Sequence, residues 1–299
     1  MRGPPGITLL LLGLVSECHV LEKNGNVKAP SEFQPLPTIH HNIDDEELPK
    51  SFDAREKWPH CPTIGKIGDS GECGHDWAIS ASSTMSDRLC IHSDGRHTLA
   101  LSAYDLRSTC PKCADELDTN GMAWIHWKTH GLVTGGLYDE RTGCQPYPCH
   151  KCSHRGRGSY PPCHPGGKPD YEWSEECRPG YNISYAEDKH FGRNAYRIMN
   201  DQKQIMKEIM TNGPVETMFA LLTDFLDYQS GVYYHQRGYM IGYYPARIIG
   251  WGEDEQDTPY WLLANSVNEQ WGENGFFRMR RGNNECGVEE FVVAGLPRV

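Results

Sequence analysis

Several side chains that could act in catalysis lie close together in the sequence, within the ten residues from Asp69 to Ala78. Glu72, His75 and Asp76 are groups of the kind that act as general acids and bases, and Ser70 adds a hydroxyl. Asp76 stands just before a helical stripe, where a negative charge is stabilised by ~0.3–1 kcal/mol. Residues so close in sequence need not converge in space. An acid–base pair of Asp76 with His75 or Glu72 is therefore one hypothesis, and a purely structural carboxylate is the other.

The elements that would position these groups fall into two kinds. Trp77, Ala81, Met85 and Leu89 recur every four residues and predict a helix with Asp76 as its N-cap. Further helices are expected at Ser102 with Asp105, around Trp124 and Trp127, and over 201–210 up to the Asn212-Gly213-Pro214 stop.

Short runs of aromatic and branched residues, separated by turn residues, follow in the second half and predict strands. They are Val215–Ala220, Gly231–Tyr234, Ala246–Gly250, Tyr260–Ala264, Gly275–Arg280 and Phe291–Ala294. We therefore expect an α+β protein with a mainly helical lobe over about 48–180, a mainly β lobe over about 181–299, and a cleft between them.

The N-terminus predicts entry into the secretory route. Arg2 precedes an apolar run from Ile7 to Val15, and Ser16-Glu17-Cys18 offers a cleavage site, so residues 1–18 are interpreted as a signal peptide. Residues 19–47, broken by prolines, are interpreted as a short leader. We expect a secreted protein, with a lysosome-like compartment as the alternative, and N-glycosylation at Asn182.

Composition restricts the partners. The 299 residues carry a net charge of −11 and no Lys/Arg-rich stretch, which argues against nucleic acid or an anionic membrane as the main partner. No apolar stretch after the signal peptide is long enough to span a bilayer.

The cysteines allow two interpretations. Cys110-x-x-Cys113 and Cys149-x-x-Cys152 have zinc-ligand spacing, with His150, His154 and His164 nearby. In an oxidising compartment the same residues are expected to form disulfides, so we predict no metal and no cofactor. Eleven cysteines follow the signal peptide, and this odd number leaves one thiol, for which Cys286 is the candidate.

The segment from Asp69 to Ala78 resembles the active-site segment of papain-family cysteine proteases, and the rest of the chain resembles their cathepsin B-like members. The segment between Cys152 and Cys163 has the length of the occluding loop, with His154 at one of its two histidine positions and Arg155 at the other. Further matching motifs are Leu48–Arg55, Tyr260–Leu262, Ala264–Ser266, Trp271–Gly272, Asn274–Phe277 and Val292–Gly295. The resemblance implies a disulfide-rich, papain-like fold over 48–299 with a helical left lobe and a β-barrel-like right lobe.

The resemblance also implies a changed active site. Asp76 stands at the position of the nucleophilic cysteine, Tyr244 at that of the histidine and Ser70 at that of the oxyanion glutamine, while Asn265 is kept. A phenol with a pKa near ~10 is a poor general base at neutral pH. Val267 stands where a tryptophan normally shields the asparagine–histidine contact.

These substitutions lead us to expect a catalytically inactive homologue that binds a peptide, a protein or a cystatin-like inhibitor through the old cleft. Trp77, Trp271, Phe291 and His154 are the expected binding residues. The alternatives are an altered hydrolase that uses Asp76 and an ordinary cysteine peptidase. The implied disulfides are Cys61–Cys90, Cys144–Cys177, Cys152–Cys163, and Cys73 with Cys110 or Cys113, the remaining one of which could bond Cys149.

Overall fold

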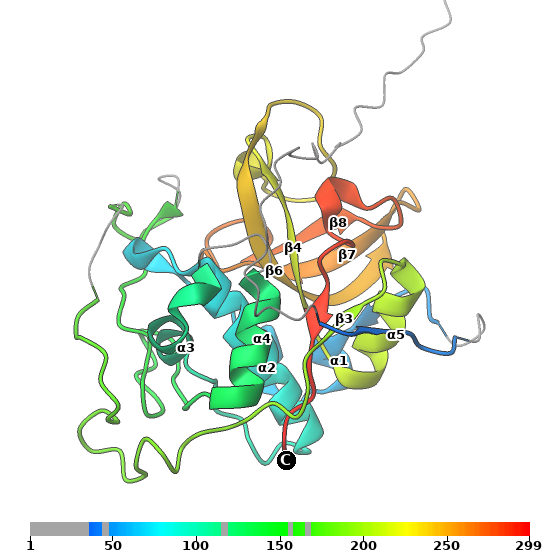
Figure 1. The fold of residues 1–299 in the computed structure, drawn as a ribbon. Helices are drawn as coiled ribbons and strands as arrows, with labels where there is room; N and C mark the ends of the chain where they lie inside the picture. Colours follow the sequence, from blue (N-terminus) through cyan, green and yellow to red (C-terminus); the bar gives the residue numbers. More distant parts are fainter. Residues whose placement is uncertain (1–35, 44–47, 115–118, 155–157, 165–168) are drawn as a thin grey trace, which may run out of the picture.

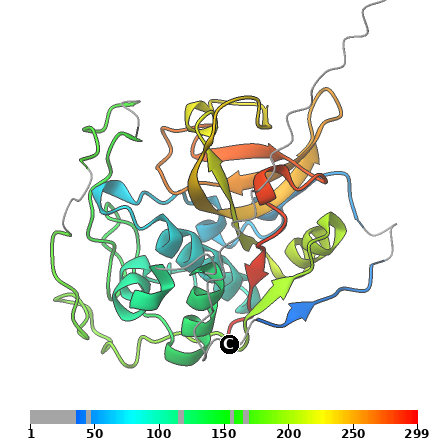
Figure 2. The same cartoon turned by 45° about the horizontal axis from the view of Figure 1, so that its top comes forward.

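Helices and strands separate along the chain and in space. The computed structural model describes residues 36–43, 48–114, 119–154, 158–164 and 169–299. Residues 1–18, Arg155 and part of the 19–47 segment lie outside this range. The helices are α1 (Ala54–Lys57), α2 (Asp76–His92), α3 (Ala103–Thr109), α4 (Thr119–His130) and α5 (Gln202–Asn212). Figures 1 and 2 show α2, α3 and α4 on one side of the molecule and the strands on the other.

Within the described residues, nine strands form one sheet, most of it from the second half of the chain. They are β1 (Thr38–Ile39), β2 (Phe52–Asp53), β3 (Tyr196–Ile198), β4 (Val215–Leu222), β5 (Val232–Tyr233), β6 (Met240–Glu253), β7 (Pro259–Ala264), β8 (Phe276–Arg280) and β9 (Val293–Ala294). The order is β1-β3-β9-β4-β6-β7-β8-β5, and β2 also pairs with β6. The expected barrel-like right lobe is therefore corrected to an open sheet, because β1 and β5 stand at its two ends and do not pair with each other.

The long helix α2 has the predicted apolar stripe. Ala81, Met85 and Leu89 are buried, and α2 packs against α3, α4 and β6. The helix begins one residue earlier than expected: His75, not Asp76, is the N-cap, and Asp76 is the first helical residue. The predicted cap of α3 is confirmed, since Ser102 Oγ accepts a hydrogen bond of 2.9 Å from the Asp105 backbone N–H.

A buried arginine fixes the second half of α2. The Arg88 side chain is fully buried and donates to Glu208 Oε1 of α5 (2.6 Å), to the Tyr196 hydroxyl of β3 (3.1 Å), and to the backbone carbonyls of Gly213, Pro214 and Gly295. A buried guanidinium must have its donors satisfied. The helix that begins at Asp76 is thereby held to both α5 and the sheet.

Disulfides hold the long loops between α4 and β3. Cys61–Cys90, Cys144–Cys177 and Cys152–Cys163 are bonded, as the resemblance implied. The pairing proposed for Cys73 needs correction: Cys73 bonds Cys149, and Cys110 bonds Cys113. Cys110 and Cys113 lie in consecutive turns with their Cα atoms 5.4 Å apart, within bonding reach of each other. Among the cysteines that the structure describes, Cys286 keeps its thiol and is buried.

We expect His126 of α4 to make the folded protein less stable in acid. Its Nε2 lies 2.9 Å from Thr109 Oγ1, which itself donates to the Asp105 carbonyl, so the neutral imidazole donates to the threonine. Burial and the neighbouring His130 lower the pKa of His126 to about 4. Because the pKa of 6.5 in the unfolded chain is higher, the unfolded chain binds more protons than the folded protein in this range. The contribution of neutral His126 to the free energy of unfolding is therefore lost as the pH falls from 6.5 towards 4.

We expect H126Q to remove part of this loss of stability at acidic pH. Relative to the wild type, the variant should gain ~2 kcal/mol of unfolding free energy between pH 7.5 and 4.5. Urea unfolding at the two pH values measures this difference. H164Q, at an exposed histidine, is the control and should show no comparable gain. Parallel pH dependence of H126Q and the wild type would contradict the prediction.

Candidate active site

A sharp turn presents Asp76 at the start of α2. Residues Gly71–Cys73 form a 3₁₀ turn, and Gly74 follows with φ of 65°, in the left-handed region that glycine adopts without strain. His75 then caps the helix and Asp76 is its first residue. The first backbone N–H groups of a helix have no partner within the helix. The site therefore combines a carboxyl group with free donors at a helix N-terminus.

The sheet supplies two further groups to the same point. Tyr244 lies in β6 opposite Phe219 of β4, and Asn265 follows the end of β7. The Tyr244 hydroxyl lies 3.2 Å from Asp76 Oδ1 and 2.7 Å from Asn265 Oδ1. Asn265 Oδ1 also accepts a 2.8 Å bond from the Ser266 backbone N–H. Side chains 168 residues apart in sequence thus form one hydrogen-bonded row across the two lobes.

The protonation of this row follows from burial. The pKa of Asp76 is raised by burial, against the opposing effects of a hydrogen bond with Ser70 and the charge of His154. The pKa of Tyr244 is raised well above its ordinary value, by burial and by the Asp76 charge. A phenol has one proton to donate, and the Asn265 oxygen is closer. Neutral Asp76 can then donate to Tyr244, which donates to Asn265.

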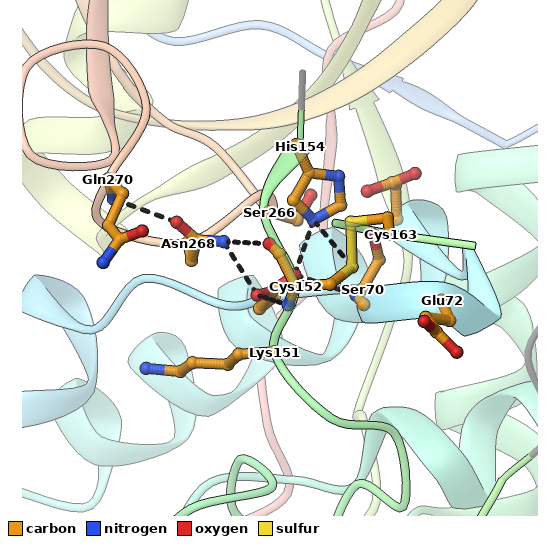
Figure 3. A network of polar contacts seen from close by, with 12 residues as sticks. Ser70, Glu72, Lys151, Cys152, His154, Cys163, Ser266, Asn268 and Gln270 are labelled. Atoms are coloured by element: carbon orange, nitrogen blue, oxygen red, sulfur yellow. Dashed lines mark hydrogen bonds and ion pairs between the residues drawn. A yellow bond between two sulfur atoms is a disulfide. The ribbon is translucent and has the colours of Figure 1, made fainter. Parts of the chain in front are cut away.

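A second network fixes the loop beside Asp76 (Figure 3). His154 Nε2 lies 2.7 Å from Asp69 Oδ1. Asp69 Oδ2 accepts bonds from the Cys152 backbone N–H (3.2 Å) and from Asn268 Nδ2 (2.9 Å). Asn268 also donates to the Cys152 carbonyl at 2.8 Å. The start of the 152–163 loop is thereby held against the residues that precede α2.

The two nearby groups proposed as partners of Asp76 have other contacts. His75 Nε2 accepts a 2.9 Å hydrogen bond from Arg107 Nε, and burial together with the Arg107 charge lowers the pKa of His75 to about 4. Glu72 Oε1 accepts a bond of 3.2 Å from the His164 backbone N–H. The partner that the structure places beside Asp76 is Tyr244.

An apolar pocket of about 270 Å³ opens beside the Asp76–Tyr244 pair. It is lined by His154, Cys163, Leu221, Phe225, Leu226, Tyr244, Asn265, Val267 and Trp271. A pocket of this size, with mostly hydrophobic walls and a few polar groups, suits one apolar side chain of a ligand. Sequence patterns do not indicate Leu221, Phe225 and Leu226 as lining residues, because they lie in a strand and a turn whose approach to residue 244 depends on sheet register.

The expected binding residues lie in different places. His154 and Trp271 line the pocket, and Trp271 is 6% exposed. Trp77 is half-buried against the core behind Asp76. Phe291 contacts the ring of Tyr243, with ring centroids 6.3 Å apart, and Tyr243 neighbours Tyr244 on β6. His154 and Trp271 therefore share the pocket with Tyr244, whereas Trp77 and Phe291 do not line it.

The cysteine spacing that suggested zinc has another explanation. Cys110, Cys113, Cys149 and Cys152 are all in disulfides, which leaves them no thiolate for a metal. Within the described ranges, the cluster with metal-ligand geometry is Cys152, His154 and Cys163, and both of its sulfurs belong to one disulfide. In the same residues no helix is long and apolar enough to cross a bilayer.

Comparisons with known proteins agree on one family. The model of the family described as papain family cysteine protease matches residues 48–296. The chain is 47% identical over 262 residues to a cathepsin B-like cysteine proteinase of Schistosoma japonicum, covering 87% of this chain and 76% of that protein. It is 42% identical over 265 residues to cathepsin B-like cysteine proteinase 4 of Caenorhabditis elegans, covering 87% and 79%.

A solved structure gives the same result. Procathepsin B S9 from Trypanosoma congolense superposes with a TM-score of 0.70 at 33% identity, covering 88% of this chain and 83% of that one. These relatives overturn the prediction of a non-catalytic binding protein. Proteins 42–47% identical to this chain are named cysteine proteinases, and this finding favours an enzyme.

Proposed function

The chain belongs to the papain family of cysteine proteases, and from this membership we propose that it hydrolyses peptide bonds in the cleft between its lobes, with Asp76 as the acid–base group. One observation carries the proposal. Asp76 stands at the start of α2, within hydrogen-bond distance of Tyr244, and Tyr244 lines an apolar pocket of about 270 Å³. A titratable group with a perturbed pKa in a cleft is a candidate reacting group.

The side chains at the family's thiol and imidazole positions require a different reaction. The phenol of Tyr244 stays neutral because its pKa is raised. A water molecule then replaces the thiolate as nucleophile. Ionised Asp76 accepts a proton from this water as the water oxygen bonds to the peptide carbonyl carbon. Neutral Asp76 returns that proton to the amide nitrogen as the C–N bond breaks, which gives a free carboxyl and a free amine.

The remaining groups have positioning roles in this proposal. The Tyr244 hydroxyl holds the carboxyl group of Asp76 and is itself held by Asn265. The backbone N–H groups at the start of α2 are the donors for the oxygen that becomes negatively charged. General acid–base catalysis typically contributes ~10²–10⁴-fold. We therefore expect turnover well below the ~1–10³ s⁻¹ of typical enzymes.

The pocket indicates the class of substrate. Its walls are mostly aliphatic and aromatic, so a peptide with an apolar side chain next to the cleaved bond fits it best. A cystatin-like inhibitor is a second protein partner that the family cleft could accept. We propose the secretory route as the setting, either outside the cell or in a lysosome-like compartment. Five disulfides and the exposed Asn182 of the glycosylation sequon support this setting.

We expect D76N to lower peptide hydrolysis by at least ~10²-fold, because the amide cannot accept the proton from water. Turnover by the wild type should rise with pH through the raised pKa of Asp76. Purified protein incubated with unstructured fluorogenic peptides from pH 4 to 8 gives both results.

The matched control is E72Q, which removes a carboxylate four residues before Asp76 that contacts the His164 backbone N–H, and it should keep wild-type turnover. A cysteine-directed epoxide should leave turnover unchanged, because the Cys286 thiol is only 1% exposed. Wild-type protein that cleaves no peptide above the buffer blank, or D76N protein that cleaves as fast as the wild type, would reject the proposal.

A further inference from the structure

Residues 36–43, here called the leader strand, lie against the edge of the sheet upstream of the family domain (Figure 1, blue). Thr38 pairs with Arg197 and Ile39 with Ile198, in parallel register with β3. The Arg197 backbone N–H donates to the Pro37 carbonyl at 2.9 Å. The leader strand thus provides hydrogen-bond partners for backbone groups along the outer edge of β3.

Side chains fix the leader strand in this register. Leu36 is 7% exposed and belongs to the hydrophobic core, against which Ile39 also packs. The backbone N–H of His41 donates to Gln204 Oε1 at 2.6 Å, and Gln204 Nε2 donates back to the His41 carbonyl at 3.1 Å. The amide side chain of Gln204 in α5 therefore forms hydrogen bonds with both the backbone N–H and the backbone carbonyl of His41.

His41 also completes a buried ionic network. Its Nε2 lies 2.7 Å from Glu208 Oε2, and Glu208 is 0% exposed. The other oxygen of Glu208 bonds Arg88 of α2 and the Tyr196 hydroxyl of β3. Burial alone would raise the pKa of Glu208, but the Arg88 charge and the hydrogen bond from His41 lower it to about 2. Without His41 this buried carboxylate would lose a partner, which is costly.

We propose that the groove between β3 and α5 is a binding site for an extended peptide strand, that residues 36–43 are its occupant, and that they stay bound as part of the folded protein even after the chain is cut between them and Leu48. Three contacts support this binding: the backbone pairing with β3, the paired hydrogen bonds of Gln204 with residue 41, and the His41–Glu208 contact.

The position of the groove separates this role from the cleft. Arg88, which connects the network to α2, follows Asp76 by twelve residues, a rise of about 18 Å along the helix. The leader strand therefore supports the end of α2 that lies away from Asp76. The inference does not depend on the proposed function, because it concerns binding and stability rather than hydrolysis.

The experiment places a specific protease site in residues 44–47 of the full chain and cuts the purified, folded protein. Gel filtration followed by mass spectrometry then tests whether the leader fragment elutes with the body. We expect co-elution for the wild type and for H40A, which alters the exposed neighbour on the same strand. For H41A we expect at least tenfold faster release of the fragment, because a hydrogen bond to a buried charge is lost.

A second readout guards against a variant that folds poorly. The cut wild type should keep its melting temperature until the fragment is removed by dilution, and added synthetic peptide of residues 33–43 should restore it. Separate elution of the wild-type fragment with no change in melting temperature would overturn the proposal. Equal release from H40A and H41A would overturn the role of His41.

Discussion

Changing Asp76 to cysteine and Tyr244 to histidine together is expected to raise peptide hydrolysis about 10³-fold and to make it sensitive to thiol reagents. The two side chains already approach within 3.2 Å across the lobes. A cysteine at a helix N-terminus beside an imidazole loses its proton readily and is a far better nucleophile than a carboxylate. Asn265, which holds Tyr244 at 2.7 Å, is in place to orient the new imidazole.

The single variants provide the controls for this prediction. D76C alone removes the proposed acid–base carboxyl and gains no base, so its turnover should fall like that of D76N. Y244H alone gains no thiol and should not exceed wild-type turnover, since residues that act as a unit are strongly non-additive. Fluorogenic peptide turnover with and without a cysteine-directed epoxide measures the effect. An inactive double variant with an unchanged melting temperature would show that the cleft no longer positions a scissile bond.

Glu216 is expected to make the protein less stable as the solution becomes alkaline. It lies on β4, fully buried; its Oε2 accepts a 2.7 Å bond from Trp124 Nε1, and its Oε1 has no hydrogen-bond partner among the described residues. Burial raises its pKa from 4.5 to about 8, despite the hydrogen bond from Trp124. The folded state therefore holds a proton that the unfolded state releases, and stability falls as the pH rises from 4.5 through 8.

The variant E216Q cannot ionise and should remove this loss. Between pH 4.5 and 9, we expect its unfolding free energy to gain ~5 kcal/mol relative to the wild type. Denaturant unfolding at several pH values tests this, with E290Q as the control at an exposed carboxylate. If the wild type and E216Q lose stability in parallel above pH 7, another group is responsible.

Local patterns predicted the helices better than the strands. The four-residue stripe found α2, and Asp201 and Gly213 bound α5 one or two residues from the expected ends. A strand was expected to begin at Ala246, but β6 begins at Met240 and includes Pro245. Proline is disfavoured inside a sheet because it has no backbone N–H. At Pro245 the strand pairs with Met218 of β4, while its pairing with β7 starts at Arg247, so the proline faces a free edge.

The positions of the site residues were predicted by motif, whereas the predicted lack of activity was wrong and the surrounding contacts were not predicted. The motifs located Ser70, Asp76, Tyr244 and Asn265, and the structure places the Tyr244 hydroxyl close to Asp76 and Asn265. The contacts of Asp69 with His154 and Asn268 join residues 85 and 199 positions apart, a separation that no spacing rule reaches. Sequence also cannot choose among cysteine partners, because the pairing of Cys73 depends on where the 149–163 loop lies.

The bond between Cys73 and Cys149 makes the cleft dependent on its chemical surroundings. It joins the turn that delivers Asp76 to the loop that carries His154, and Cys152–Cys163 closes that loop a few residues later. A thiol reductant that cleaved these two bonds would remove the covalent links between that turn and that loop. The loop would then depend on contacts such as the one between His154 and Asp69 for its position.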